Sequence, residues 1–462
     1  MSDALRLAGQ RVLVVGLARS GVAAARVAHA RGAQVTVTDR RAATELGTVV
    51  NELGPSVELA LGGHDLADFT RADLIVVSPG VPLSLPEIQS ARRQGVPVLA
   101  EVELAVRLLP PLPLIGITGT NGKSTTTALT GALLGRDRRV FTGGNLGTPL
   151  CELVLSGREV DALVLELSSF QLEGIDRLRP KVAALLNVTP DHLDRHHTFE
   201  NYAAAKSRIF ENQTAADYVV LNADDATCFA MAPKAKAPVY WFSRQHPVEH
   251  GAFVRGDDVI WHDAERELTI MPVAEIGLKG AHNVENVLAG VCAGMLAGVD
   301  PGDIRRAVAA FKAVEHRLEF VATIRGVDYY NDSKATNVDA TIKALESFPG
   351  GIHLILGGKD KGSDYAVLNP LLQQRVKRVY TIGAAAPKIE SQIKGVPIVS
   401  AGTIDTAVRL AGESATADDI ILLAPACASF DQFVSYEHRG RVFKDLVRQM
   451  ESRELQHAGG KA

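Results

Sequence analysis

The sequence contains few cysteines and almost no excess of charge. Its 462 residues include four cysteines, and none stands close enough to another for the short spacings of a metal knuckle or a redox pair. We therefore expect a reducing compartment, the cytoplasm. Lysine and arginine together number 49 against 53 aspartates and glutamates, a formal net charge of −4. This balance gives no indication of a nucleic-acid partner.

Long hydrophobic runs are also missing. The first ten residues lead directly into an apolar strand pattern, without the apolar core of a secretory signal. The longest apolar run, residues 287–299, is interrupted by glycines and is too short to cross a bilayer. We expect no membrane partner, and we expect a monomer that acts on small molecules.

The chain does contain enough apolar sequence for several cores. With 46% hydrophobic residues and a usual domain size of roughly 150 residues, the length predicts three domains. Short apolar runs alternate with helical stretches, which predicts an α/β protein with mostly parallel sheets and ligands at the carboxyl ends of the strands. The proline-rich segment 108–114 and a change of pattern near residue 313 divide the chain into 1–108, 109–313 and 314–462.

The first domain begins with an apolar strand that ends in the turn of residues 16–21 (GLARSG). This turn has the first and last glycines of a dinucleotide-binding fingerprint, with Ala18 in place of the middle one. Asp39 ends the next predicted strand, near the distance expected for an acid that binds a ribose. The motif fits a nucleotide diphosphate or a plain helix-packing turn, and it does not distinguish NAD from a UDP-sugar.

The strongest chemical signal is the loop of residues 119–125 (GTNGKST), between a buried strand over 114–118 and a helix. Such a loop points backbone N–H groups at a phosphate, and the helix N-terminus adds partial positive charge. Lys123 can reach the terminal phosphates, and Ser124 is placed to hold Mg²⁺. Ile117 stands where the strict phosphate-loop pattern has its first glycine, so an ordinary glycine-rich turn is the alternative. We predict nucleotide binding here.

Two further segments follow apolar strands of the second domain. Glu166 ends the strand pattern of 162–166, so its carboxylate should emerge near the phosphate loop, where an acid can meet Mg²⁺. A surface acid at a strand end is the alternative. In residues 187–197 (NVTPDHLDRHH), His192 and His196 have an i, i+4 spacing, but the H-E-x-x-H pattern of a zinc site is missing. We predict a catalytic loop beside the nucleotide.

Lys206 lies in an otherwise apolar helical face. In residues 198–210 the apolar side chains recur with helical spacing, and Lys206 falls within their stripe. A partly buried ammonium is disfavoured by desolvation, so we expect its pKa to be lowered. A neutral amine can react with CO₂ to form a carbamate. A lysine that extends its ammonium to solvent is the ordinary alternative.

The third domain carries four polar segments, and three of them follow predicted strands. The segments are residues 316–319, 331–337, 357–362 and 425–431, and predicted strands cover 353–356, 378–382 and 420–423. Each segment alone could be a turn. Together they predict a binding face for carboxylates and phosphates, because they are rich in lysine, serine and threonine.

These motifs resemble those of the Mur ligases, which build the peptide stem of peptidoglycan. The resemblance rests on the phosphate loop, Glu166, the segment 187–196 and Lys206, and it extends from Gly16 to about Arg441. The segments 331–337 (NDSKATN) and 425–433 (PACASFDQF) are most similar to members that add D-glutamate to UDP-N-acetylmuramoyl-L-alanine. The resemblance implies a Rossmann-like N-terminal domain for the UDP-sugar, a central P-loop-type ATPase domain and a C-terminal Rossmann-like domain for ATP and amino acid.

The resemblance also implies roles for individual residues. The catalytic group would be Lys123, Glu166, His192 and a carbamylated Lys206, and two Mg²⁺ ions would be held by Ser124, Glu166, His192 and Lys206. ATP would contact Thr120, Asn121, Gly122, Lys123, Ser124, Thr125, Thr126, Asn283, Arg317 and Asp332. The UDP-sugar would contact Arg19, Ser20, Asp39, Arg41, Ser78 and Asn145. D-Glutamate would contact Thr336, Lys361, Ser429 and Tyr436. Ala18 and Tyr436 depart from the family, which usually has glycine and phenylalanine there.

The predicted residues suit ATP-dependent amide formation. Transfer of the ATP γ-phosphate to a carboxylate gives an acyl phosphate, and Lys123 with two Mg²⁺ ions can neutralise the charge that develops. The alternatives are a folylpolyglutamate-type ligase, a nicotinamide dehydrogenase and a nucleotide-gated binding module. The glycine turn of the first domain argues against a folylpolyglutamate-type ligase. A dehydrogenase would leave Lys123 and Glu166 unused. ATP turnover that requires both an acid and an amine would separate a ligase from a binding module.

Overall fold

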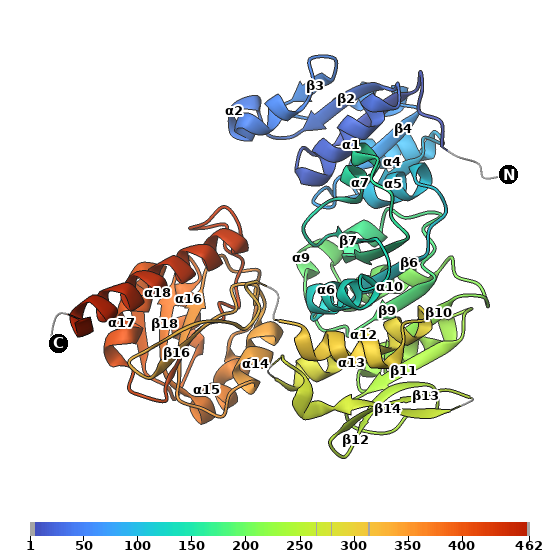
Figure 1. The fold of residues 1–462 in the computed structure, drawn as a ribbon. Helices are drawn as coiled ribbons and strands as arrows, with labels where there is room; N and C mark the ends of the chain where they lie inside the picture. Colours follow the sequence, from blue (N-terminus) through green and yellow to red (C-terminus); the bar gives the residue numbers. More distant parts are fainter. Residues whose placement is uncertain (1–4, 265, 279, 313–314, 460–462) are drawn as a thin grey trace. The chain divides into compact units, whose positions relative to one another are not determined.

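The structure is a computed structural model, and it describes all residues except 1–4, 265, 279, 313–314 and 460–462. The described residues form three β-sheets and fall into two compact units (Figure 1). One unit comprises residues 1–275 with 285–309, and the other comprises 276–284 with 310–462. The predicted α/β class is therefore confirmed. The domain boundaries at residues 108 and 313 stay predictions.

The first sheet is parallel throughout, with the strand order β3-β2-β1-β4-β5. Its elements are β1 (Arg11–Val15), α1 (Arg19–Ala30), β2 (Gln34–Asp39), α2 (Ala43–Leu46), η1 (Gly47–Glu52), β3 (Glu58–Leu61), α3 (Leu66–Arg71), β4 (Leu74–Val77), α4 (Pro86–Arg93), β5 (Val98–Ala100) and α5 (Glu101–Leu108). Alternate residues of β1 serve two cores: Val12 and Val14 pack with α1, whereas Leu13 and Val15 pack with α3 and α4. Because the strands are parallel, the turns after β1, β2 and β4 meet at one edge of the sheet.

The second sheet has the order β14-β13-β12-β11-β10-β9-β6-β8-β7. Its strands are β6 (Leu114–Thr118), β7 (Val140–Gly144), β8 (Ala162–Glu166), β9 (Val182–Leu185), β10 (Tyr218–Asn222), β11 (Val239–Ser243), β12 (Gly251–Arg255), β13 (Asp258–His262) and β14 (Glu267–Pro272). The helical elements are α6 (Lys123–Leu134), α7 (Leu150–Ser156), α8 (Ser169–Leu172), α9 (Leu193–His196), α10 (Phe199–Ser207), η2 (Arg208–Phe210), α11 (Ala226–Met231), η3 (Ala232–Lys234), η4 (Val273–Glu275), α12 (Ala281–Leu296) and α13 (Pro301–Ala310). The strands from β7 to β12 are parallel, and β6 lies between β8 and β9. The phosphate loop therefore leaves the sheet beside the ends of β8 and β9.

Helices α1, α5 and α7 form the seam between the first and second sheets (Figure 1), where they pack on one another around a shared hydrophobic core. Two buried carboxylates at the start of α5 reinforce this seam. Glu103 accepts hydrogen bonds of 2.9–3.0 Å from the backbone N–H groups of residues 176–178 and one of 2.7 Å from Arg107. Glu101 Oε1 accepts a 2.6 Å bond from the Cys151 N–H, whereas its buried Oε2 has no hydrogen-bond partner among the described residues.

The third sheet has the order β15-β16-β20-β17-β18-β19 and is parallel apart from the β15–β16 hairpin. Its elements are β15 (Glu319–Ile324), β16 (Val327–Asn331), α14 (Val338–Glu346), β17 (Ile352–Gly357), η5 (Ala366–Leu368), α15 (Asn369–Arg375), β18 (Val376–Ile382), α16 (Ala386–Gln392), β19 (Ile398–Gly402), α17 (Ile404–Ser414), β20 (Ile420–Leu423) and α18 (Tyr436–Gly459). Helices α17 and α18 lie side by side over one face (Figure 1), and α14, α15 and α16 contribute to the core of the other.

Several local predictions are confirmed. The strands expected at 114–118, 162–166 and 420–423 have those bounds, and Asp39 ends β2 as expected. The antiparallel strands β13 and β14 at the edge of the second sheet were not predicted. The four cysteines are free and buried. Within the described part of the chain, no helix is both long and apolar enough to cross a membrane.

Candidate active site

The predicted phosphate loop connects β6 to α6. Gly122 is the N-cap residue of α6 and has φ +81°, a left-handed conformation that favours glycine. A Cβ atom on Gly122 would lie 2.1 Å from Oδ1 of Asn286, whose side chain also accepts a 3.3 Å hydrogen bond from the Thr126 hydroxyl. The glycine is therefore required by both the backbone conformation and the close approach of α12.

The loop is held from outside by Asn187 and Tyr202. Asn187 Oδ1 accepts hydrogen bonds from the N–H groups of Thr120 at 3.1 Å and Asn121 at 2.8 Å. The Tyr202 hydroxyl lies 3.1 Å from Thr120 Oγ1. Asn187 opens the segment predicted as a catalytic loop, but the sequence predicted no individual role for Asn187 or Tyr202. A polar residue directly after a buried strand was the available signal for Asn187.

Lys123 folds back over its own loop. Its Nζ donates to the carbonyl oxygens of Gly119 at 3.0 Å and Thr120 at 2.7 Å. The ammonium group therefore lies at the strand-to-helix turn, which is where a phosphate-binding lysine is needed.

Glu166 lies beside the phosphate loop, as predicted from its place at the end of β8. Its carboxylate is 1% exposed and accepts hydrogen bonds from Ser124 Oγ at 2.5 Å and Asn145 Nδ2 at 2.6 Å. A hydroxyl and a carboxylate are oxygen ligands of the kind that Mg²⁺ prefers. Ser124 and Glu166 are therefore a donor set that could hold a magnesium ion.

Lys206 is buried against the same loop. It is 1% exposed, its Nζ donates to Gly119 O at 2.6 Å, and it lies 4.5 Å from the centre of the Tyr202 ring. Burial and the nearby Lys123 ammonium lower the pKa of Lys206 well below its usual value. The alternative of a lysine that reaches solvent is therefore wrong, whereas the carbamate stays a prediction.

The two histidines of the 187–197 segment have different partners. His192 has φ 53°, its ring meets Phe170 edge-on at 4.9 Å, and its Nε2 lies 3.6 Å from Asp191 Oδ2. His196 is buried and hydrogen-bonded to Ser169 Oγ at 3.0 Å. The one three-ligand cluster found among the described residues includes neither histidine. A zinc site therefore gains no support here.

The predicted uridylate contacts lie at the carboxyl edge of the first sheet. Asp39 accepts hydrogen bonds from the Leu17 N–H at 2.7 Å and from the Arg41 guanidinium at 2.8 Å. Although burial opposes ionisation, these bonds lower the pKa of Asp39 to about 2. Ser78 Oγ donates to Gly16 O at 2.7 Å, which ties β4 to the glycine turn. Arg19 and Ser20 form the first turn of α1, with Arg19 exposed.

The loops predicted to bind D-glutamate are joined by backbone bonds and by one buried arginine. An isolated bridge pairs Lys359 with Ala428, which brings the loop of Lys361 beside that of Ser429. Arg439 is fully buried and donates to the carbonyls of Ser333 and Cys427, so it connects the loop of Thr336 to that of Ser429. Lys334 Nζ lies 3.7 Å from the centre of the Tyr436 ring.

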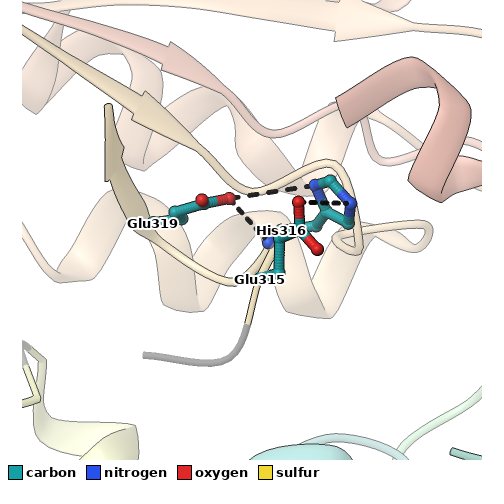
Figure 2. A group of neighbouring side chains, drawn as sticks. All are labelled: Glu315, His316 and Glu319. Carbon is teal, nitrogen blue, oxygen red and sulfur yellow. Dashed lines mark hydrogen bonds and ion pairs between the residues drawn. The ribbon is translucent and has the colours of Figure 1, made fainter. Parts of the chain in front are cut away.

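The predicted ATP contacts of the second compact unit include Arg317 and Asp332. Burial raises the pKa of Asp332 to about 7, although the Arg317 guanidinium opposes this shift. The neighbours of Arg317 form the three-ligand cluster, in which Glu315 and Glu319 approach different nitrogens of the His316 ring (Figure 2). Asn283 is buried in the first turn of α12, within residues 276–284 of the same unit.

Three family models match consecutive segments of the chain. They describe a Mur ligase MurD-like N-terminal domain over residues 10–100, a Mur ligase middle domain over 117–294 and a Mur ligase glutamate ligase domain over 316–427. The UDP-N-acetylmuramoylalanine--D-glutamate ligase of Koribacter versatilis is 57% identical over 96% of this chain and 99% of its own length. The protein of that name from Anaeromyxobacter dehalogenans is 53% identical over 96% of this chain and 98% of its own length.

Solved structures share the fold at low sequence identity. A pseudomurein peptide ligase type C from Methanothermus fervidus has a TM-score of 0.61 at 19% identity, covering 96% of this chain and 100% of that one. The MurF ligase of Thermotoga maritima in complex with ADP has a TM-score of 0.59 at 18% identity, covering 98% of each chain. The family models fall on all three sheets, and relatives that share more than half of their residues align over nearly the full length. The chain therefore belongs to the Mur ligase family.

Proposed function

We propose that this chain joins D-glutamate to UDP-N-acetylmuramoyl-L-alanine in an ATP-dependent reaction with an acyl-phosphate intermediate. The observation that carries the proposal is the buried group around the phosphate loop. There, Ser124 and Asn145 are hydrogen-bonded to Glu166, and the Lys206 amine lies on Gly119. The names of the relatives support the choice of both substrates. The reaction is a cytoplasmic step of peptidoglycan synthesis, carried out by a monomer.

The first half-reaction activates the carboxylate of the UDP-linked substrate. A carboxylate oxygen attacks the γ-phosphorus of ATP, the bond from that phosphorus to the β,γ-bridging oxygen breaks, and ADP leaves. Lys123 exchanges its two backbone carbonyl partners for phosphate oxygens and neutralises the charge on the transferring group. Backbone N–H groups at the start of α6 hold the phosphates.

The second half-reaction forms the amide. The amine of D-glutamate attacks the acyl carbon, the resulting tetrahedral intermediate loses inorganic phosphate, and the nitrogen loses a proton. Lys361 supplies a positive charge for one carboxylate, while Thr336 and Ser429 supply hydroxyl donors. The bridge at Lys359 and the hydrogen bonds of Arg439 support a common role, because they connect the loops that carry these three residues.

Glu166, Ser124, His192 and a carbamylated Lys206 are proposed to hold two Mg²⁺ ions. When bound, magnesium supplies positive charge that stabilises the transferring phosphoryl group. The lowered pKa of Lys206 supports carbamylation, because CO₂ reacts with the neutral amine. In that reaction the amine nitrogen bonds to the carbon of CO₂ and releases one proton, which leaves a carboxylate-like ligand.

Phosphate release with defined substrates tests the proposal. The assay contains ATP, Mg²⁺ and UDP-N-acetylmuramoyl-L-alanine with D-glutamate, L-glutamate, L-lysine or meso-diaminopimelate. We expect phosphate release with D-glutamate, and none when either the acceptor or the amino acid is omitted. Preference for a diamino acid would contradict the assignment of D-glutamate, and phosphate release without an amino acid would contradict coupled ligation.

A further inference from the structure

Arg317 lies in a strained turn. The residues on either side of it, His316 and Leu318, have φ values of 67° and 41°. Residues with a Cβ atom rarely adopt this left-handed conformation, and they keep it only where surrounding contacts impose it. The side chain of Arg317 is therefore directed by a backbone that the rest of the domain must hold in place.

Glu319 and Asn331 hold one side of this turn. Glu319 Oε2 accepts a 2.9 Å hydrogen bond from the His316 N–H and a 3.0 Å bond from the Asn331 amide. The Asn331 amide also lies 2.8 Å from His316 Nδ1. On the other side, the Leu318 N–H donates to Asp332 Oδ1 at 3.3 Å. The Glu319 carboxylate is therefore the acceptor that closes the turn at its first strained residue.

Helix α18 contacts the turn at two successive levels. A Cβ atom on Gly440 would lie 2.2 Å from His316 Nδ1, so the helix backbone packs directly against the imidazole. One turn further along, Lys444 Nζ donates to Glu319 Oε1 at 2.6 Å and to Glu315 Oε1 at 2.8 Å. The Lys444 side chain is only 11% exposed. The helix thus brings a positive charge to the carboxylate that closes the turn.

Lys444 supplies the positive charge next to the cluster of Glu315, His316 and Glu319 that Figure 2 shows. Glu315, His316 and Glu319 have the types and separations of metal ligands, yet the Lys444 ammonium is bonded to both carboxylates. Burial lowers the pKa of Lys444, but the hydrogen bonds to Glu315 and Glu319 outweigh this effect and raise it above its usual value. The ammonium keeps its charge, so it neutralises two carboxylates that would otherwise repel each other.

We infer that Lys444 is a positioning residue for Arg317: its ammonium fixes Glu319, and Glu319 holds the strained turn that directs Arg317 toward ATP. The inference rests on the proposed function and on the predicted contact of Arg317 with ATP. It gives Lys444 no contact with the reacting atoms. Loss of the ammonium should therefore weaken ATP binding and leave the two other substrates unaffected.

The test compares Lys444→Met with Lys444→Arg and with a matched control, Lys377→Met. Lys377 also pairs with a carboxylate of the third-sheet domain, Asp419, at 2.6 Å. Lys377 lies at the start of β18 and Asp419 just before β20, so the pair is at the opposite edge from the predicted ligand loops. We expect Lys444→Met to raise the KM for ATP about tenfold. The kcat and the KM values for D-glutamate and the UDP-linked acceptor should change less than about twofold. Lys444→Arg should restore most of the ATP affinity, and Lys377→Met should resemble wild type.

Two further variants keep the inference open to refutation. Glu319→Gln retains an acceptor for the His316 N–H without the charge, so it should raise the KM for ATP in the same direction by a smaller factor. Arg317→Ala reports whether the arginine contributes to ATP binding at all. If Lys444→Met leaves the KM for ATP unchanged, or raises all three KM values together with a fall in Tm, the inference is wrong.

Different experimental results would contradict the positioning role of Lys444 and the proposed function. If Arg317→Ala raises the KM for ATP and Lys444→Met does not, only the positioning role of Lys444 is contradicted. If Arg317→Ala leaves the KM for ATP unchanged, both the positioning role of Lys444 and the contact of Arg317 with ATP are contradicted. Absence of phosphate release by the wild-type enzyme contradicts the proposed function itself.

Discussion

The buried carboxyl group of Glu101 should make the stability of the first compact unit depend on pH near neutrality. Glu101 lies in the seam between the first and second sheets, where Oε1 accepts one backbone hydrogen bond and Oε2 is buried. Burial raises the pKa of Glu101 from its usual 4.5 to about 7. The folded state therefore binds this proton more tightly than the unfolded state does.

The direction and size of the effect follow from this difference. Between about pH 4.5 and about pH 7 the folded state holds the proton and the unfolded state has released it, so the free energy of unfolding falls as the pH rises. Above about pH 7 both states are ionised and the loss is complete. At about 1.4 kcal/mol for each pH unit, the total loss is about 3 kcal/mol, of which about 2–3 kcal/mol falls between pH 5 and pH 8.

Glu101→Gln isolates this contribution, because an amide stays neutral and still offers an oxygen to the Cys151 N–H. Urea unfolding at pH 5, 6, 7 and 8 can be followed by tryptophan fluorescence. Both tryptophans, Trp241 and Trp261, lie in the second sheet and report on the unit that contains Glu101. We expect the variant to gain about 2–3 kcal/mol relative to wild type between pH 5 and pH 8.

Two comparisons make the result decisive. Asp332, whose pKa burial also raises to about 7, lies in the other unit and is present in both proteins, so its effect cancels. Glu159→Gln changes an exposed carboxylate that lies just before β8 in the same unit, and it should leave the pH dependence of wild type nearly unchanged. If wild type and Glu101→Gln lose stability in parallel from pH 5 to pH 8, Glu101 is ionised throughout and the reasoning is refuted.

Three further outcomes are expected. Lys123→Ala should lower kcat for phosphate release at least about a hundredfold with an unchanged circular dichroism spectrum, and near-normal turnover would contradict its role in the phosphate loop. Lys206→Ala should lose activity to a similar degree. Labelled bicarbonate should give a carbamate carbon signal in wild type that the variant lacks. Full activity of Lys206→Ala in CO₂-depleted buffer would exclude a role for the carbamate. Glu103→Ala should lower the free energy of unfolding by about 3–5 kcal/mol in urea titrations. The substitution removes the buried acceptor of the Arg107 guanidinium and of the N–H groups of residues 176–178. A loss below about 1 kcal/mol would show that water replaces the carboxylate.

The sequence predicted the parts of the site that depend on local pattern. The phosphate loop was predicted because a buried strand, a glycine turn and a helix are consecutive in the chain, and Glu166 because it ends an apolar strand. The burial of Lys206 followed from the helical spacing of its apolar neighbours. In each case the decisive information lies within about 13 residues of the chain.

The remaining parts depend on contacts between distant segments. Asn187 and Asn286 support the phosphate loop from positions 66 and 160 residues along the chain. Asn187 at least follows a buried strand, but no local pattern distinguishes Asn286 from a surface asparagine. Lys444 reaches Glu319 across 125 residues, from a helix that also carries the exposed arginines Arg441, Arg448 and Arg453. Contacts of this kind depend on strand order and helix packing. The periodic spacing of apolar residues in the sequence does not predict either of them.

The strand order of the third sheet has a consequence for the synthesis of the protein. β20 lies in the middle of that sheet, between β16 and β17, yet it is the last strand in the described part of the chain. The sheet cannot close until residue 423 has left the ribosome, and until then β16 and β17 present unpaired edges that can join other chains. A premature stop codon before residue 420 would remove a central strand, so the shortened product should aggregate instead of folding with a trimmed terminus.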